Sequence, residues 1–79
     1  VSIDVLSKLS NEDLLQLIRA LPSGYRTVFN LYVIEGYTHK EVAELCSIKE
    51  GTSKSQLAKA KAMLQEMVLK NYLIFNEGT

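Results

Sequence analysis

The sequence predicts an all-α domain of four helices that ends in a helix-turn-helix. Apolar residues recur at intervals of three and four in four successive segments, and each segment has a helix-start signal. No alternating apolar and polar run and no Asn-Gly turn suggests a β-hairpin. A chain of 79 residues with 47% hydrophobic content can bury one small core. We therefore expect one domain over residues 10–79, preceded by the end of an inter-domain linker at residues 1–9.

The first helix is expected to begin after Ser10. The Ser10 hydroxyl can accept a hydrogen bond from the following turn, and Glu12 and Asp13 suit the positive N-terminal end of a helix. Pro22 ends this helix because proline cannot continue one. The apolar stripe expected to face the core consists of Leu14, Leu17, Ile18 and Leu21.

The second helix is expected between Pro22 and Gly36. A proline in the first turn costs nothing, because its missing N–H has no partner within the helix. A glycine just past the last turn is a common helix end. The residues at helical spacing in this segment are Tyr25, Val28, Phe29, Tyr32 and Val33.

The third helix is predicted to be short and to begin at a capping box. Thr38 is followed three residues later by Glu41, so that each side chain can accept from the backbone N–H of the other residue. The helix should end near Cys46, where a turn of a few residues follows. The residues expected to face inward are Val42, Ala43 and Leu45, and Cys46 is also expected to belong to the core.

The fourth helix is predicted from about Glu50 to the high sixties. Its buried face should consist of residues spaced alternately four and three apart, namely Ser53, Leu57, Ala60, Leu64 and Met67. At about 100° per residue, the opposite face carries Thr52, Ser55, Lys59 and Ala62, with Lys54 beside them. Residues 72–75 either continue this helix or fold back on it, and the pattern leaves both open.

Charge is distributed unevenly along a chain that is neutral overall. Between Lys49 and Lys61 stand four lysines against Glu50 alone, a local charge of +3, so that the remaining chain carries −3. Such a run is commonly a solvated helix face. Here it coincides with small and polar residues at the start of the second helix of a helix-turn-helix, the end that enters the DNA major groove. The combination predicts DNA binding.

Ten residues are the candidate DNA contacts. Lys54 and Lys59 are assigned to phosphates, and Thr52 and Ser55 to base edges or phosphates. His39 is expected to be a first-turn surface residue near a phosphate. Gln56 could read adenine, although it lies on the helix flank. The full set is Thr38, His39, Lys40, Lys49, Gly51, Thr52, Lys54, Ser55, Gln56 and Lys59.

An enzyme, a metal site and a membrane span are not expected. His39 and Cys46 are seven residues apart, roughly 10 Å along one helix, and there is no other Cys or His to join them. No nucleophile-base pair or glycine-rich phosphate loop can be assembled, so no cofactor is predicted. A single cysteine allows no intramolecular disulfide, which favours a cytoplasmic protein. No apolar run reaches the roughly 20 residues of a membrane span, and the start at Val1 suggests a piece of a longer protein.

Three segments in order resemble region 4 of extracytoplasmic-function sigma factors. They are Leu21-Pro22-Ser23-Gly24-Tyr25-Arg26-Thr27-Val28-Phe29, then Tyr37-Thr38-His39-Lys40-Glu41-Val42-Ala43-Glu44, then Glu50-Gly51-Thr52-Ser53-Lys54-Ser55-Gln56-Leu57 with Ala60. The resemblance covers about residues 10–67 and implies a winged-helix-like, sigma region 4 type of helix-turn-helix. It also implies recognition of the minus thirty-five promoter element, docking on the β flap of core RNA polymerase, and occlusion by an anti-sigma factor.

The chain departs from this family pattern at the turn and at the reading helix. Ser47 stands where glycine is usual, and a left-handed serine would cost on the order of 1 kcal/mol. Lys49 stands where serine or threonine often caps the helix, and a lysine side chain cannot accept from backbone N–H groups. Gln56 and Lys59 stand where arginines are frequent, so we expect fewer bidentate contacts and modest DNA affinity.

Two alternative functions stay open at this point. The chain could be the helix-turn-helix output domain of a transcriptional regulator, which would usually act as a symmetric dimer on a palindromic site. It could instead be an anti-sigma or protein-interaction module. In that case the apolar residues of segments 67–69 and 72–75 would dock a partner.

Overall fold

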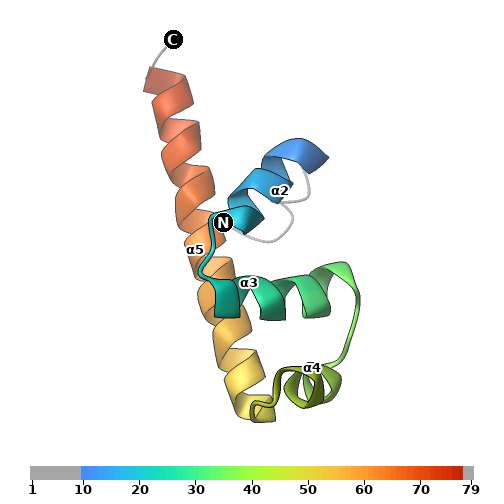
Figure 1. The fold of residues 1–79 in the computed structure, drawn as a ribbon. Coiled ribbons are helices and arrows are strands. Elements are labelled where there is room, and N and C mark those ends of the chain that lie inside the picture. The colour runs from blue at the N-terminus through green and yellow to red at the C-terminus, as the bar shows by residue number, and fades with distance from the viewer. Residues whose placement is uncertain (1–9, 78–79) are drawn as a thin grey trace.

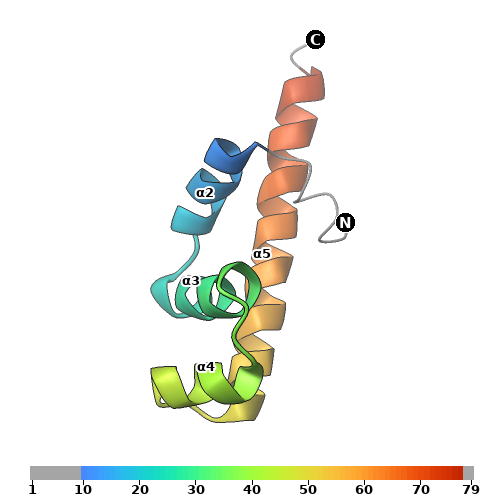
Figure 2. The ribbon, with the colours of Figure 1, turned by 90° about the vertical axis from the view of Figure 1, so that its right-hand side faces the viewer.

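The computed structural model describes residues 10–77, with the side chains of residues 10–70, and all of its regular elements are helices. In chain order these are α2 (Asn11–Arg19), α3 (Ser23–Phe29), the π-helical segment η1 (Asn30–Ile34), α4 (His39–Cys46) and α5 (Glu50–Glu77). The three shorter α-helices follow one another along one side of α5 (Figures 1 and 2). The predicted all-α class with a helix-turn-helix is confirmed.

Helix α2 begins and ends at side-chain hydrogen bonds. The Ser10 hydroxyl accepts from the backbone N–H of Asp13 at 3.1 Å, which confirms the predicted N-cap. At the other end, the guanidinium of Arg26 on α3 donates to the backbone carbonyl of Arg19 at 3.1 Å. This second bond satisfies a carbonyl that has no partner within its own helix, and it ties α3 to α2.

The predicted second helix is divided into two different helical forms. The helix starts beside Pro22, as predicted, although Pro22 is the N-cap residue of α3 and not part of its first turn. The regular α-helix ends at Phe29. The next turn is wider, and the N–H of Glu35 donates to the carbonyl of Asn30 five residues earlier at 2.9 Å. The turn then stops at Gly36, whose φ of 81° places it in the left-handed region that glycine tolerates.

Helix α4 has both hydrogen bonds of the predicted capping box and ends at Cys46. Val42 and Ala43 are buried, as expected. The prediction that Leu45 faces inward is wrong, because its side chain is 60% exposed. Cys46, the residue four positions after Val42, is half-buried and packs against the core, as expected.

The turn between α4 and α5 is a Schellman motif with a serine at its left-handed position. Ser47 has φ 55° and ψ 44°, while the N–H of Ile48 donates to the carbonyl of Ala43 at 3.0 Å. Ile48 is half-buried and packs against the core. The left-handed position at which the family pattern has glycine is therefore occupied by a residue that pays a steric cost there.

We predict that Ser47→Gly stabilises the domain by about 1 kcal/mol, because glycine adopts the left-handed conformation without a clash between Cβ and the backbone. Chemical denaturation of the two proteins measures the change. Ser55→Gly is the matched control, since Ser55 is exposed in the second turn of α5 and glycine within a helix should destabilise it. A destabilised Ser47→Gly protein would show that the serine makes a compensating interaction.

Helix α5 is the helix on which the other elements pack. Its buried residues are Ser53, Leu57, Ala60, Leu64 and Val68, which confirms the predicted stripe as far as Leu64. Beyond Leu64 the fully buried position is Val68, and Met67 is only half-buried at its side. The largest fully buried side chain is Phe29 on α3, which belongs to the same core cluster.

Two further expectations concern the ends of the chain, namely the course of residues 72–75 and the linker at residues 1–9. The backbone of residues 72–75 continues α5, which runs eight or so residues beyond its predicted end. The expected linker at residues 1–9 lies outside the described residues, so the domain boundary stays a prediction.

Candidate nucleic-acid interface

The capping box at the start of α4 fixes three of the candidate contact residues. The Thr38 hydroxyl accepts from the N–H of Glu41 at 3.1 Å, and the Glu41 carboxylate accepts from the N–H of Thr38 at 3.0 Å. His39 and Lys40 follow in the first helical turn, where backbone N–H groups lack partners within the helix. Thr38 and Lys40 are exposed, so this end of α4 is accessible to an anion.

The capping box also lowers the pKa of Glu41. The main cause is the hydrogen bond from the Thr38 backbone N–H, followed by that with the Thr38 side chain, while slight desolvation acts in the opposite direction. Both hydrogen bonds favour the ionised carboxylate. Because the pKa is lower in the folded state, the contribution of Glu41 to stability is present above its ordinary pKa. It is lost as the pH falls through the lowered value.

We predict that Glu41→Gln destabilises the domain at neutral pH and that the difference from the natural protein disappears in acid. The glutamine amide is neutral and has no net charge to interact with the helix N-terminus, and the protonated glutamic acid behaves in the same way. Unfolding curves measured from pH 7 down to about pH 3 follow the two proteins. A difference that stays constant over this range would contradict the assigned role of the carboxylate.

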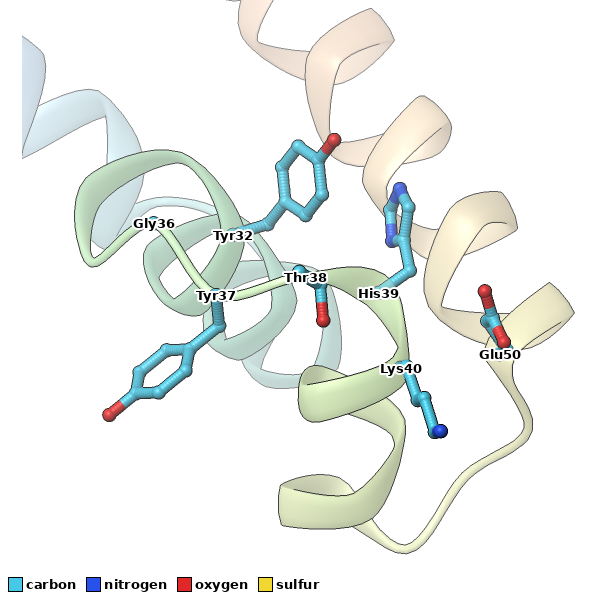
Figure 3. A pocket seen from close by; sticks show the side chains of 7 residues that line it. All are labelled: Tyr32, Gly36, Tyr37, Thr38, His39, Lys40 and Glu50. Carbon is cyan, nitrogen blue, oxygen red and sulfur yellow. The ribbon is translucent and has the colours of Figure 1, made fainter.

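A hollow joins the start of α4 to the start of α5. Its volume is about 500 Å³, and Figure 3 shows its lining, which consists of Tyr32, Gly36, Tyr37, Thr38, His39, Lys40 and Glu50. Three of the predicted contact residues, Thr38, His39 and Lys40, therefore lie together. Glu50 is the acidic member of the hollow and was not among the candidate contacts.

His39 is more constrained than a surface residue of a first turn. Its Nδ1 lies 2.9 Å from the hydroxyl oxygen of Ser53 on α5. Its ring stacks on Tyr32, with ring centroids 4.2 Å apart and an angle of 19° between the planes. The side chain is half-buried, and in Figure 3 the ring points toward α5. The expectation of an exposed His39 side chain is thus replaced by a contact among three elements.

The start of α5 carries the predicted polar residues. Lys49 and Gly51 are exposed and Thr52 is half-buried. The carbonyl of Lys49 accepts from the N–H of Ser53 at 3.0 Å, so Lys49 occupies the cap position without a side chain that can accept a hydrogen bond. The free N–H groups of this turn point along the helix axis, away from the rest of the helix.

The exposed face of α5 matches the face predicted from the helical pitch. Lys54, Ser55, Lys59 and Ala62 are all exposed, and they flank the buried stripe of Ser53, Leu57 and Ala60 on its outer side. The side chains on this face are small or basic. A surface of this kind can approach a phosphate backbone closely and neutralise its charge.

Gln56 lies apart from the other candidates. It is half-buried and lines a second hollow of about 360 Å³ together with Gly24, Thr27, Val28, Leu45, Cys46 and Ile48. No residue of this hollow lines the one at the start of α4. Of the ten predicted contact residues, Thr38, His39 and Lys40 thus share the first hollow, and Gln56 alone lines the second, between α3 and the turn.

The hydrogen bond of Ser53 with His39 and the stacking of Tyr32 on the same ring were not predicted from the sequence. Ser53 is the one polar residue recorded among the fully buried side chains of the described part, with 0% exposure. A serine within an otherwise apolar stripe requires a hydrogen-bond partner, and this requirement was the signal available in the sequence. Its partner His39 is 14 residues away, so helical spacing alone did not identify it.

Neither a metal centre nor a membrane span is found in the described part of the chain. Among these residues, no three His, Cys, Asp or Glu side chains gather into a group that could hold a metal ion. Likewise, none of the described helices combines the length and the apolar character that crossing a bilayer requires.

Comparison with protein families decides the class of this helix-turn-helix. Residues 11–64 match the model of the family described as Sigma-70, region 4. The chain belongs to this family. A region 4 domain is a DNA-binding part of a sigma factor, which acts in transcription initiation and its regulation with promoter DNA and RNA polymerase, and the family is not an enzyme family. The comparison of this region 4 domain with curated proteins gave no match.

Proposed function

We propose that this region 4 domain recognises the minus thirty-five promoter element for a sigma factor of the extracytoplasmic-function type. In this proposal the start of α5 reads the DNA in the major groove, and the domain also docks on the β flap of core RNA polymerase. The single observation that carries the proposal is the small, basic and exposed face at residues 54–62 of α5. The family membership supplies the polymerase and the promoter as the context for that face.

Base reading is assigned to the first two turns of α5. Gly51 and Ser55 are exposed and carry little or no side chain, so the backbone can approach the floor of the groove. Thr52 is half-buried and stands beside them. The hydroxyls of Thr52 and Ser55 can donate to or accept from base edges, which gives sequence preference.

Phosphate binding is assigned to the lysines and to the start of α4. Lys54 and Lys59 lie on the exposed face of α5, and Lys40 and Lys49 lie at the starts of the two helices. Thr38 is exposed at the start of α4, beside the backbone N–H groups of His39 and Lys40, which the capping box leaves free for a phosphate. These contacts fix the position of the domain on the duplex and carry no sequence information by themselves.

Polymerase docking is assigned to apolar residues at the end of the molecule that is remote from α4. Leu15 on α2 is 51% exposed and Leu69 on the distal half of α5 is 44% exposed. The two elements lie at the other end of the molecule from α4 (Figure 2). Exposed apolar side chains of this size are suited to a protein partner. We also propose that an anti-sigma factor binds this domain. It would block transcription by covering these apolar residues or the DNA-reading face.

The interaction-module alternative loses support from the burial of its proposed docking segment. Val68 is buried and Met67 packs against the core, which leaves Leu69 as the exposed apolar residue of segment 67–69. The side chains of residues 72–75 lie outside the described ones. The dimeric regulator is distinguished by its DNA site, because a symmetric dimer selects a palindrome and a region 4 domain an asymmetric element.

The roles of the two classes of residue are tested by the salt dependence of binding. Lys59→Ala should weaken binding to all sequences and reduce the slope of log K against log salt by about one unit, as expected for one lost phosphate contact. Lys70→Ala is the matched control, because the same charge is removed roughly 16 Å farther along α5. Variants of Thr52 and Ser55 should alter sequence preference instead. An altered preference with an unchanged slope in Lys59→Ala would refute the assignment.

A further inference from the structure

The imidazole of His39 connects three elements of the domain. Its Nδ1 lies 2.9 Å from Ser53 Oγ on α5, and its ring stacks at 4.2 Å on Tyr32 of η1, while its own backbone belongs to α4. Figure 3 shows the ring of His39 lying between Tyr32 and α5. One of the two ring nitrogens and one ring face are therefore occupied by contacts within the protein.

Ser53 is the residue through which this contact acts on the reading helix. Its side chain is fully buried, with 0% exposure, on the stripe that faces the core. A buried hydroxyl needs its hydrogen bond, so the position of Ser53 relative to His39 is restricted. Thr52 and Ser55, the proposed base-reading residues, are one residue before and two residues after it on the same two turns.

Fixing Ser53 fixes the rotation of α5 about its axis. A rotation of only about 20° displaces a side-chain atom about 5 Å from the helix axis by about 1.7 Å. A displacement of this size is enough to break hydrogen bonds to base edges, which tolerate a few tenths of an ångström. The rotation of α5 is thus a quantity on which sequence reading depends.

We infer that His39 is a positioning residue that sets the rotation of α5 through Ser53, and that its imidazole does not bind DNA. This inference rests on the proposed function, because it assumes that α5 reads the duplex. It removes His39 from the set of predicted DNA contacts and leaves Thr38 and Lys40 in that set. The side chain of Lys40, the next residue, is exposed and makes the phosphate contact instead.

Three substitutions separate the hydrogen bond from the stacked ring. His39→Asn keeps a polar group near the position of Nδ1 and removes the ring. His39→Phe keeps a ring against Tyr32 and removes the hydrogen bond. Ser53→Ala removes the hydroxyl on the other side. Each variant of the 79-residue chain is measured against the duplex selected by the natural protein and against a scrambled duplex, at several salt concentrations.

The expected result is a loss of sequence preference without a loss of phosphate contacts. His39→Phe and Ser53→Ala should each reduce the ratio of affinities for the selected and scrambled duplexes about five-fold, a typical value for one net hydrogen bond. A protein with both His39→Phe and Ser53→Ala should lose no more preference than either single variant, because both changes remove the same hydrogen bond. His39→Asn should retain most of the preference. All the variants of His39 and Ser53 should keep the natural slope of log K against log salt, whereas Lys40→Ala should reduce this slope by about one unit.

Two results would overturn the inference. One is a His39→Asn protein with the reduced salt slope of Lys40→Ala, which would identify a phosphate contact. The other is a Ser53→Ala protein with natural preference. If the natural chain itself shows no preference among duplexes, the proposed function fails. If the natural chain has a preference and Ser53→Ala keeps it, the inference fails alone.

A measurement on the natural protein covers the case in which a variant does not fold. The side-chain nitrogen resonances of His39 are followed by NMR as DNA is added. We expect Nδ1 to show the hydrogen-bonded state before and after addition, and Nε2 to gain no new hydrogen bond, while the amide of Lys40 shifts. A new hydrogen bond to Nε2 on DNA binding would contradict the inference.

Discussion

Phe29→Ala is expected to destabilise the domain by about 3–5 kcal/mol, because it removes a large buried side chain and leaves a cavity. Phe29 is 2% exposed and belongs to the core cluster that joins α3 to α5. Small domains have only about 5 kcal/mol or a little more to lose. The variant should therefore keep only about 0–2 kcal/mol of stability. Its unfolding temperature, measured by far-UV circular dichroism, should fall far below that of the natural protein.

The matched control for Phe29 is an apolar residue on the surface. Leu15→Ala removes a side chain that is 51% exposed, and surface substitutions usually change stability by less than about 0.5 kcal/mol. If Phe29→Ala unfolds at nearly the natural temperature, the packing of α3 on α5 is not the main stabilising contact. The helix-turn-helix would then have to be held together by other contacts.

Ser55→Glu is expected to weaken DNA binding by about two orders of magnitude, since it places a carboxylate against the phosphates or base edges. Juxtaposed like charges in an interface cost several kcal/mol, and each 1.4 kcal/mol is a factor of ten. Ser55 is exposed in the second turn of α5, so the longer side chain should not disturb the core. Fluorescence anisotropy with a labelled duplex measures the affinity.

The control for Ser55 has the same change in charge outside the reading face. Gln16 is exposed on α2, and Gln16→Glu should change the affinity little, because its charge is screened at physiological salt. Equal losses in the two variants would mean that net charge, and not contact by α5, governs binding. An unchanged affinity in Ser55→Glu would place the DNA elsewhere on the domain.

Local signals in the sequence predicted most helix boundaries correctly. Ser10 and Thr38 cap their helices as expected, because a hydroxyl followed by an acidic residue in the first turn satisfies the free N–H groups. Gly36 adopts the positive φ that ends a helix. Each of these signals acts within four residues, so no tertiary information is needed to recognise it.

Features that depend on packing were predicted less well. The sequence predicted both Leu45 and Cys46 inside, but only Cys46 packs against the core, and Leu45 is exposed. The wide turn at Asn30–Ile34 has no signal in a pattern of 3.6 residues. The far end of α5 has no glycine or proline to stop it before Gly78, and the helix continues to Glu77.

The exposed face of α5 was predicted from the sequence, but the contacts between helices at the candidate interface were not. Helical pitch correctly gives Lys54, Ser55 and Lys59 as exposed. The contact between His39 and Ser53 depends on how α4 crosses α5, which no local pattern specifies. Whether each of the predicted residues touches DNA stays a prediction.

The most direct test of the account is selection of bound DNA from a random duplex pool. The full-length factor with core RNA polymerase is run beside this domain alone at low salt. Enrichment of one asymmetric upstream element by both samples is the predicted result, and it would assign the reading of that element to α5. A palindromic element would contradict the account in favour of a dimeric regulator, and an unenriched pool would contradict DNA reading by this domain.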